Sequence, residues 1–366
     1  MDQGKTLRRG WTTGACATAA AKAAYAALRH GEFPDPVTIR LPGGETPAFA
    51  LARAERLEGG ALAAVVKDAG DDPDVTHGAL ILVTVRLLPA GEGLRFKAGP
   101  GVGTITRPGL PLPPGEPAIN PGPRAMIRAA LEEVSPDPDA EVEISIADGE
   151  RLAERTLNGR LGILGGLSVL GTTGIVIPYS CAAWIDSIHR GVDVARAMGI
   201  AHVAGSTGSA SEAAVQKLHG LPDVALIEMG DFVGGMLKYL RRHPIPRVTV
   251  AGGVAKMTKL AQGRLDLHSK RGEADLAALG ALLPGADLAA RIAAANTVAE
   301  AFQIAEQAGQ PLGDAIAIRA WTVAAEALHP APTELEIVVF DRTGRMLGRA
   351  DFAPVAHSPS LPRNRR

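Results

Sequence analysis

The second half of the chain alternates short apolar segments with segments of helical pattern. The apolar segments include HVAGSTG from residue 202, VALIEMGD from residue 224 and RVTVAGGV from residue 247. Each is followed by a helical pattern, and residues 181–198 carry another one. Strands that alternate with helices form βαβ units and therefore a mainly parallel sheet. The pattern predicts a Rossmann-like, mainly parallel α/β domain over residues 151–366, with LGILGG from residue 161 as its first strand.

The end of the chain adds further elements to this predicted domain. Helical patterns cover about residues 287–308 and 312–328. The segments TELEIVVFD and RMLGRA then predict two strands, joined by a tight turn at residues 342–344.

The first half indicates the α+β class. An Ala-rich helix is predicted over residues 15–30, with Thr12 or Thr13 as its cap and Gly31 after its end. A second helix is predicted over about residues 123–134. Strands are predicted at residues 37–41, 48–53, 61–66, 79–88 and 141–147. Residues 99–124 are too rich in Gly and Pro for regular structure. A chain of 366 residues suggests two domains, which we expect at 1–150 and 151–366.

Composition excludes several classes of function. A net charge of −1 lacks the basic surface of a nucleic-acid binder, and 4% aromatic residues offer few platforms for base stacking. Cys16 and Cys181 stand far apart without a ligand pattern, so neither a disulfide nor a metal site is predicted. No segment has the apolar length of a signal peptide or of a membrane span. We therefore expect a soluble cytoplasmic protein, and the sequence leaves open whether it forms a homo-oligomer.

Loops of Gly, Ser and Thr follow several of the predicted strands, at residues 165–174, 205–208 and 251–253. Glu228 and Asp231 follow a fourth strand. In open α/β sheets the ligand lies over the carboxyl ends of the strands, and small residues there let it approach the backbone. Each loop alone is also explained as a turn, but together they favour a nucleotide-like ligand. The loops match neither the GxGxxG fingerprint nor a P-loop, which argues against a dinucleotide or a nucleoside triphosphate.

Two further features allow both a structural and a functional interpretation. The segment WTTGACATAAAKAA places Thr12 and Thr13 at a helix entrance, where they form either a capping turn or a small anion site. Basic residues at loops are either solvated surface or contacts for a polyanionic small substrate. These basic residues are Lys97, Arg107, Arg124, Lys256, Lys259 and Arg264.

Nothing in the sequence indicates nucleophilic catalysis. His189, His202 and His219 have no metal-ligand spacing, and a surface or core position explains each. The serines lack the GxSxG elbow of α/β-hydrolases.

Six stretches resemble one protein family. They are LRRGWTTGACATAAAKAA (7–24), AGPGVGTITRPGLPLPPGEPAINPGPRAMI (98–127), GILGGLSVLGTTGIVIPYSCAAWIDSI (162–188), HVAGSTGS (202–209), IEMGDFVGGML (227–237) and VAGGVAKMTKLAQG (250–263). In this order, over residues 7 to about 270, they resemble the CbiD family of cobalt-precorrin-5B (C1)-methyltransferases. The Ala-rich region after residue 272 is less distinctive.

The resemblance implies a methyl donor, S-adenosylmethionine, and a cobalt-corrinoid acceptor. Cobalt-precorrin-5B would be methylated at C1 to give cobalt-precorrin-6A, in the anaerobic, cobalt-early route to cobalamin. The cobalt would belong to the substrate and not to the protein. Transfer from a sulfonium to carbon is an in-line displacement, so alignment and exclusion of water matter more than a nucleophile.

Combined with the strand-end pattern, the resemblance implies three sets of site residues. The expected donor-binding residues are Gly165, Gly166, Gly171, Thr172, Thr173, Gly174, Ser206, Thr207, Gly208 and Glu228. The expected substrate-binding residues are Thr12, Thr13, Arg107, Asn120, Arg124, Lys256 and Lys259. Asp186, His202 and Asp231 are candidates for a general base, and Glu228 is a fourth.

Two alternatives belong to other classes. A phosphoryl-transfer enzyme would also place a Gly-rich loop before a helix, and it would bind ATP. A corrinoid carrier or pathway scaffold would bind the macrocycle without turnover, although the low aromatic content gives it little support.

Overall fold

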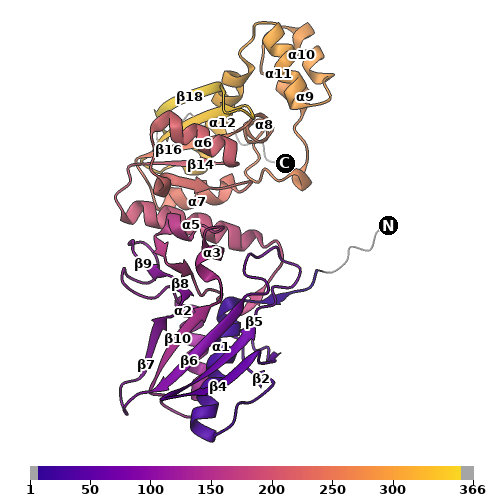
Figure 1. The fold of residues 1–366 in the computed structure, drawn as a ribbon. Helices are drawn as coiled ribbons and strands as arrows, with labels where there is room; N and C mark the ends of the chain where they lie inside the picture. Colours follow the sequence, from indigo (N-terminus) through magenta and orange to yellow (C-terminus); the bar gives the residue numbers. More distant parts are fainter. Residues whose placement is uncertain (1–6, 356–366) are drawn as a thin grey trace. The chain divides into compact units, whose positions relative to one another are not determined.

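The computed structural model describes residues 7–355. The chain forms two compact units, Met1–Ser180 and Cys181–Arg366 (Figure 1). The sequence suggested a change of domain at residues 150/151, whereas the contacts divide the chain after Ser180. The segment between these positions belongs to the first unit because its short strands pair with strands of that unit.

The first unit contains a mixed five-stranded sheet of order β4-β5-β6-β10-β7. Its strands are β4 (Arg53–Leu57), β5 (Gly60–Val66), β6 (Leu80–Leu87), β7 (Leu94–Ala98) and β10 (Ala140–Ile146). Only β10 and β7 are parallel. Alternate residues of β6 and β10 are buried, and they share a core with α1 (Thr13–His30) and α2 (Pro121–Glu132). This arrangement confirms the predicted mixture of helices and strands in the first half.

Short elements complete the first unit. The two-residue strands pair as β1 (Gly10–Trp11) with β13 (Ile175–Val176), β2 (Val37–Thr38) with β3 (Ala48–Phe49), β8 (Gly101–Val102) with β12 (Gly166–Leu167), and β9 (Thr104–Ile105) with β11 (Ile163–Leu164). The helices α3 (Gly149–Ala153) and α4 (Asn158–Leu161) lie between them in sequence.

The prediction that LGILGG is the first strand of the parallel sheet is wrong. Gly162 and Gly165 have positive φ angles of 77° and 82°, which interrupt an extended strand on either side of β11. What remains are two-residue pairings with β9 and β8 inside the first unit.

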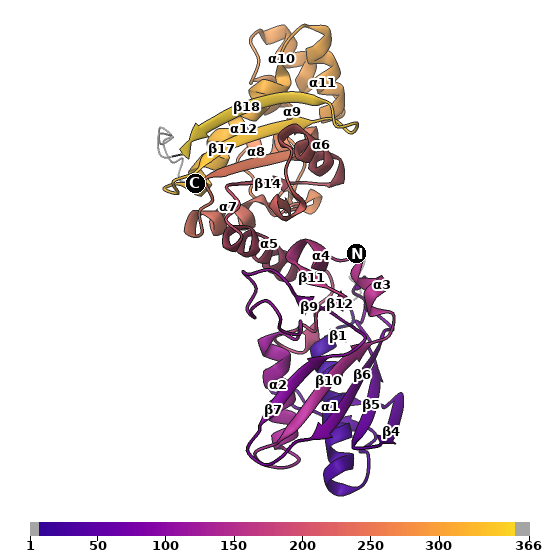
Figure 2. The same ribbon diagram turned by 60° about the vertical axis from the view of Figure 1, so that its left-hand side comes forward.

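The second unit contains a mostly parallel five-stranded sheet of order β15-β14-β16-β17-β18 (Figure 2). Its strands are β14 (His202–Ser206), β15 (Leu226–Glu228), β16 (Arg247–Gly253), β17 (Glu334–Phe340) and β18 (Met346–Pro354). The first four in sequence run parallel, and β18 returns antiparallel to β17. The predicted parallel sheet and the predicted final strand pair are both confirmed.

Helices cover the two faces of this sheet unequally. They are α5 (Cys181–Ala197), α6 (Ser209–His219), α7 (Val233–Arg242), α8 (Val254–Ala261), α9 (Leu276–Gly280), α10 (Ala286–Ala293), α11 (Val298–Gln307) and α12 (Leu312–Leu328), with 3₁₀ turns η1 (Asp223–Ala225) and η2 (Ser269–Arg271). The main core joins α5, α7, α8 and α12 to one face, whereas α6 packs on the other face through Val215. The helix predicted over residues 287–308 is two helices, because the Thr297 side chain caps a new start at α11.

In the described part of the chain, every helix is too short or too polar to cross a membrane.

The entrance to α1 confirms the capping interpretation of Thr12. The Ala15 N–H donates to Thr12 Oγ1 at 3.1 Å, and Thr12 is 6% exposed. A loop covers this end of the helix, because the Gly14 N–H donates to the Leu170 carbonyl and the Thr12 N–H donates to the Gly174 carbonyl. Gly31 ends the helix with a left-handed φ of 95°, as predicted.

Replacing Thr12 tests this capping role. Thr12→Ala is expected to lower the free energy of unfolding by about 1 kcal/mol, because it leaves an N–H at the buried helix start without its acceptor. Thr12→Ser retains the oxygen and is expected to stay close to the unsubstituted protein. Urea unfolding measures both, and equal stability of the Ala and Ser variants would contradict the capping role.

Candidate functional site

A large cavity lies at the carboxyl ends of β14, β16 and β17, within the second unit. Its volume is about 1200 Å³. It is lined by residues 207–211 after β14, 253–256 after β16 and 340–347 around the turn after β17, together with the start of α11 and residues 309–313. Because α6 and α8 leave β14 and β16 toward opposite faces, this is the edge of an open sheet where ligands bind.

Four glycines at this edge divide into two kinds. A side chain at Gly205 would lie 2.4 Å from Met236, and one at Gly252 would lie 2.6 Å from Met257, so close packing explains both. A Cβ atom at Gly208 or Gly253 would meet no atom within 4 Å. The backbone at Gly208 (φ 172°) and Gly253 (φ −74°) is open to any residue. Neither the fold nor the backbone requires glycine at these two positions, and both keep the approach to the cavity free.

Lys256 connects the loops of this edge. Its Nζ donates to the Thr207 carbonyl at 2.7 Å and lies 3.0 Å from Asp231 Oδ1. Lys256 and Asp231 thus form an ion pair. Asp231 Oδ1 is buried and accepts no hydrogen bond from a residue in the described part of the chain. The ammonium group of Lys256 therefore lies beside the cavity, paired with the carboxylate of Asp231.

Ser206 and Thr207 are buried residues at the same strand end. Ser206 is fully buried, and its Oγ has no hydrogen-bond partner within residues 7–355. Thr207 is 6% exposed and lines the cavity. The structure thus brings together Ser206, Thr207, Gly208 and Lys256 from the predicted set.

The turn after β17 forms a wall that the sequence interpretation did not include. Asp341 accepts hydrogen bonds from the Thr343 Oγ1 at 2.6 Å, the Thr343 N–H at 2.8 Å and the Arg345 N–H at 3.0 Å. The Thr343 hydroxyl, followed by the backbone donors, lowers the pKa of Asp341 to about 2, so this wall carries a permanent carboxylate. Asp341 directly follows the apolar segment that forms β17. A carboxylate after an apolar strand is the pattern by which Glu228 and Asp231 were predicted, so the sequence could have indicated Asp341 as well.

The other carboxylates of the predicted set lie beside the cavity or away from it. Glu228 ends β15, is exposed and does not line the cavity, and its carbonyl accepts from Trp184 Nε1 at 3.3 Å. Asp231 reaches the site only through Lys256. Asp186 lies on α5, where it is largely exposed and paired with Arg190.

The predicted residues of the first unit gather at the starts of α1 and α2. A Cβ atom at Gly171 would lie 2.3 Å from Thr12 Oγ1, one at Gly174 would lie 2.5 Å from Leu41, and one at Gly122 would lie 3.2 Å from Thr172. Gly171 and Gly174 also have positive φ angles, so packing and backbone conformation both require glycine there. Gly165, Gly166 and Thr173 were predicted to bind the donor because their loop was expected to follow a strand of the parallel sheet. The loop at residues 165–174 instead belongs to the first unit, so this reason no longer applies to them.

The other predicted residues near these helix starts and in the loop at residues 165–174 differ in how they pack. Asn120 is the N-cap residue of α2, although its side chain makes no capping hydrogen bond, and Thr13 is buried. Gly166 packs against the Gly101 carbonyl, whereas Gly165 has free space around it.

Besides Lys256, the other three basic residues of the predicted substrate-binding set also have intramolecular partners. Arg107 donates to the Arg160 carbonyl at 2.6 Å. Arg124 donates to the Ile119 carbonyl and pairs with Glu116, both at 2.8 Å. Lys259 is 9% exposed and donates to the Leu267 carbonyl at 3.2 Å. Lys259 in particular serves the interior of the second unit.

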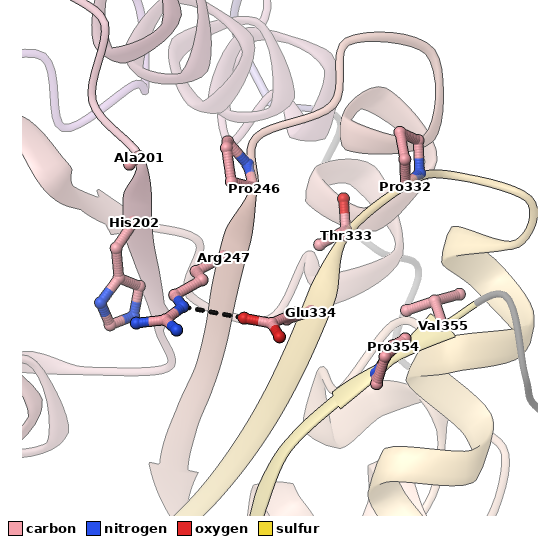
Figure 3. Close-up of a pocket in the computed structure, with 9 residues that line it drawn as sticks. All are labelled: Ala201, His202, Pro246, Arg247, Pro332, Thr333, Glu334, Pro354 and Val355. Atoms are coloured by element: carbon pink, nitrogen blue, oxygen red, sulfur yellow. Dashed lines mark hydrogen bonds and ion pairs between the residues drawn. The ribbon is translucent and has the colours of Figure 1, made fainter.

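His202 lies at the opposite end of the sheet. It begins β14 and lines a second hollow of about 490 Å³, beside the ion pair of Arg247 and Glu334 at 2.8 Å (Figure 3). Its Nε2 lies 2.8 Å from Thr249 Oγ1, which donates to the fully buried Glu336 at 2.7 Å. His202 is therefore part of a polar network at the amino ends of the strands and not of the strand-end group that was predicted.

His219 and Arg349 complete this network. His219 Nε2 lies 2.7 Å from Glu336 Oε2, and Arg349 donates to Glu336 Oε1. Burial, followed by the neighbouring His219, lowers the pKa of His202 to about 4. His202, His219 and Glu336 are close enough to hold a metal ion, but Arg349 already compensates the charge of the carboxylate.

A mostly parallel sheet with an open cavity at its strand ends places the chain in the class of α/β proteins, which commonly bind small molecules at that edge. The family model described as CbiD matches residues 1–178, and the one described as CbiD, C-terminal domain, matches residues 266–351. A cobalt-precorrin-5B C(1)-methyltransferase of Agrobacterium fabrum is 63% identical over 98% of this chain and 96% of its own. One of Halorhodospira halophila is 63% identical over 96% of both chains. The chain therefore belongs to the CbiD family.

A crystal structure of a cobalamin biosynthesis protein (cbiD) from Archaeoglobus fulgidus is 27% identical, covers 68% of this chain and 77% of its own, and gives a TM-score of 0.38.

The lowered pKa of His202 predicts how stability depends on pH. Between about pH 6.5 and pH 4 an unfolded histidine binds a proton that the folded His202 does not bind, so the unfolded state gains stability as the pH falls. The stability contributed by neutral His202 is present above about pH 6.5 and is lost toward pH 4. Urea unfolding across this range is expected to show a shallower loss for His202→Gln than for the unsubstituted protein. Identical slopes for the two proteins would contradict the assignment.

Proposed function

We propose that this chain transfers a methyl group from S-adenosylmethionine to C1 of cobalt-precorrin-5B, in the cytoplasm, on the anaerobic route to cobalamin. The product would be cobalt-precorrin-6A. The observation that carries this proposal is the identity of 63% over nearly the whole length to relatives named for this reaction. The α/β unit with its strand-end cavity supports it by offering a place for an adenosyl ligand.

We place the donor at the ends of β14 and β16, in the cavity of the second unit. Gly208 and Gly253 leave free space beside the backbone, and the unpartnered Ser206 hydroxyl is buried next to it. Glu228 ends the neighbouring strand β15 outside the cavity lining, and it remains a proposed contact for the ribose hydroxyl groups of a donor that extends toward that strand. These features fit a small ligand with both polar and apolar parts, which the methyl donor is.

The donor would supply a methyl group that is already activated on a sulfonium, so the protein needs no nucleophile. The task of its residues is to hold two ligands in line and to exclude water, which accounts for a large part of such a barrier. The mostly apolar wall of Val254, Val298, Phe302 and Leu347 suits the exclusion of water.

The acceptor carries many acetate and propionate side chains, and cationic side chains suit it. Within the second unit, Lys256 and Arg342 line the cavity, and Arg342 makes no ion pair with a described residue. Thr12, Thr13, Asn120, Arg107 and Arg124 remain proposed contacts in the first unit. We remove Lys259 from this set because its ammonium is buried and bonded internally.

Asp231 is the base that we favour if the acceptor loses a proton. Of the four candidates it alone is connected to the cavity, through the 3.0 Å contact with Lys256, and Glu228 does not line the cavity. Asp186 is exposed on α5, and His202 lies at the other end of β14.

The first prediction concerns turnover and ligand choice. Incubation with cobalt-precorrin-5B and S-adenosylmethionine is expected to give a product heavier by one CH₂ unit together with S-adenosylhomocysteine, both measured by mass spectrometry. Isothermal titration is expected to show saturable binding of S-adenosylhomocysteine but not of ATP. Binding of ATP alone would favour a phosphoryl-transfer enzyme, and binding of the macrocycle without turnover would favour a carrier.

A second prediction tests the placement of the donor. Gly208→Val is expected to lower the affinity for S-adenosylhomocysteine about tenfold or more, because it blocks backbone donors whose bonds to a charged group contribute about 1.5–3 kcal/mol. Its stability should not change, since the new side chain meets no atom within 4 Å at its Cβ. Gly205→Ala is the contrasting control: it should destabilise the fold by about 1–3 kcal/mol through its clash with Met236. Unchanged affinity in a folded Gly208→Val protein would remove this loop from the donor site.

A further inference from the structure

Two helices begin at the strand-end cavity without a side-chain cap. The N-cap residues of α6 and α8 are Gly208 and Gly253, which have no side chain to accept from the first N–H groups, and the Ser211 hydroxyl at the start of α6 donates to the Gly208 carbonyl. The first N–H groups of a helix have no partner within it, and together with the helix dipole they favour an anion. Residues 208–211 and 253–256 line the cavity, so the starts of both helices face the same space.

The hydroxyl of Thr207 is an independent sign of a ligand at this place. Thr207 is 6% exposed and lines the cavity, and its Oγ1 makes no hydrogen bond with any residue in the described part of the chain. The oxygen is not among the fully enclosed polar atoms without a partner, so its unused hydrogen-bonding capacity lies at the surface of the cavity, where a ligand can reach it. A bound acceptor group would satisfy it.

Lys256 adds a cationic donor at the same place, paired on one side with Asp231. Its Nζ is 2.7 Å from the Thr207 carbonyl, and an ammonium group has one more donor than its contacts with Thr207 and Asp231 use. The parallel pairing of β14 with β16 holds these groups together, since Ser206 stands opposite Ala251 and the Thr207 N–H donates to the Ala251 carbonyl at 3.0 Å.

We propose that Thr207, the N–H groups at the starts of α6 and α8, and Lys256 form a subsite for a carboxylate group. These groups are hydrogen-bond donors that converge on one end of the cavity, and a carboxylate accepts several charge-assisted bonds at once. The choice of a carboxylate over other anions rests on the proposed function. Two ligands of that reaction carry the group: the methyl donor in its amino-acid part, and the macrocycle in its acetate and propionate chains.

The test compares ligand pairs that differ in the carboxylate. S-Adenosylhomocysteine is compared with 5′-methylthioadenosine, which lacks the amino-acid part, and cobyrinic acid is compared with cobinamide, whose side chains are amidated. Isothermal titration gives the affinity ratio within each pair. The unsubstituted protein is expected to prefer the carboxylate form in at least one pair, and the pair that shows the preference identifies the source of the group.

Two substitutions remove single donors from the subsite. Thr207→Val removes the hydroxyl at nearly constant volume, and Thr207→Ser retains it. Ser209→Pro removes one N–H at the first position of α6, where proline fits a helix, and Ser209→Ala retains that N–H. Thr207→Val and Ser209→Pro are each expected to reduce the preference for the carboxylate form about tenfold, whereas the two conservative variants should keep it.

Each outcome decides the proposal. A preference in the adenosyl pair that falls in either donor-removing variant assigns the subsite to the methyl donor, and the same result in the corrinoid pair assigns it to the macrocycle. If the unsubstituted protein prefers the carboxylate form in neither pair, or if the preference survives both substitutions, the subsite does not exist. Turnover by the unsubstituted protein, measured separately, distinguishes this failure from a failure of the proposed function.

Discussion

The parallel pairing of β14 with β16 is the constraint on which the second unit depends. The ladder runs from His202 opposite Arg247 to Ser206 opposite Ala251, and the Thr207 N–H extends it beyond the strand end. Because α6 and α8 leave toward opposite faces, neither helix closes the space above these two strands. The ladder therefore sets both the position of the cavity and the donors that surround it.

Similar loops serve different purposes in the two units. The loop that contains Gly171 and Gly174 is tightly packed against α1 and Leu41, and its glycines have left-handed conformations. The loops that contain Gly208 and Gly253 have ordinary conformations and empty space where a side chain would be. A loop rich in Gly, Ser and Thr thus predicts that another group lies close to its backbone. Only the structure shows whether the neighbouring helix fills that space or whether it is open to a ligand.

The sequence predicted what local patterns determine. The helix cap at Thr12, the strands β14 to β17 and the turn near Thr343 follow from nearby residues, and so does the grouping of Ser206, Thr207 and Gly208 at one strand end. It did not predict that β11 and β12 pair within the first unit, because two-residue strands carry no periodic signal. Nor could it show that His202 and Ser206, four residues apart on one strand, belong to opposite ends of the sheet.

The antiparallel course of β18 has a practical consequence. Since β18 begins at the cavity wall with Met346 and ends at Pro354, beside Thr333 and Glu334, the chain leaves the sheet at the amino ends of the parallel strands. A label attached at the exposed Pro354 would therefore stand at the end of this sheet opposite the cavity. Immobilisation through a group at Pro354 is accordingly the orientation in which the surface contacts the end of the sheet that the cavity does not occupy.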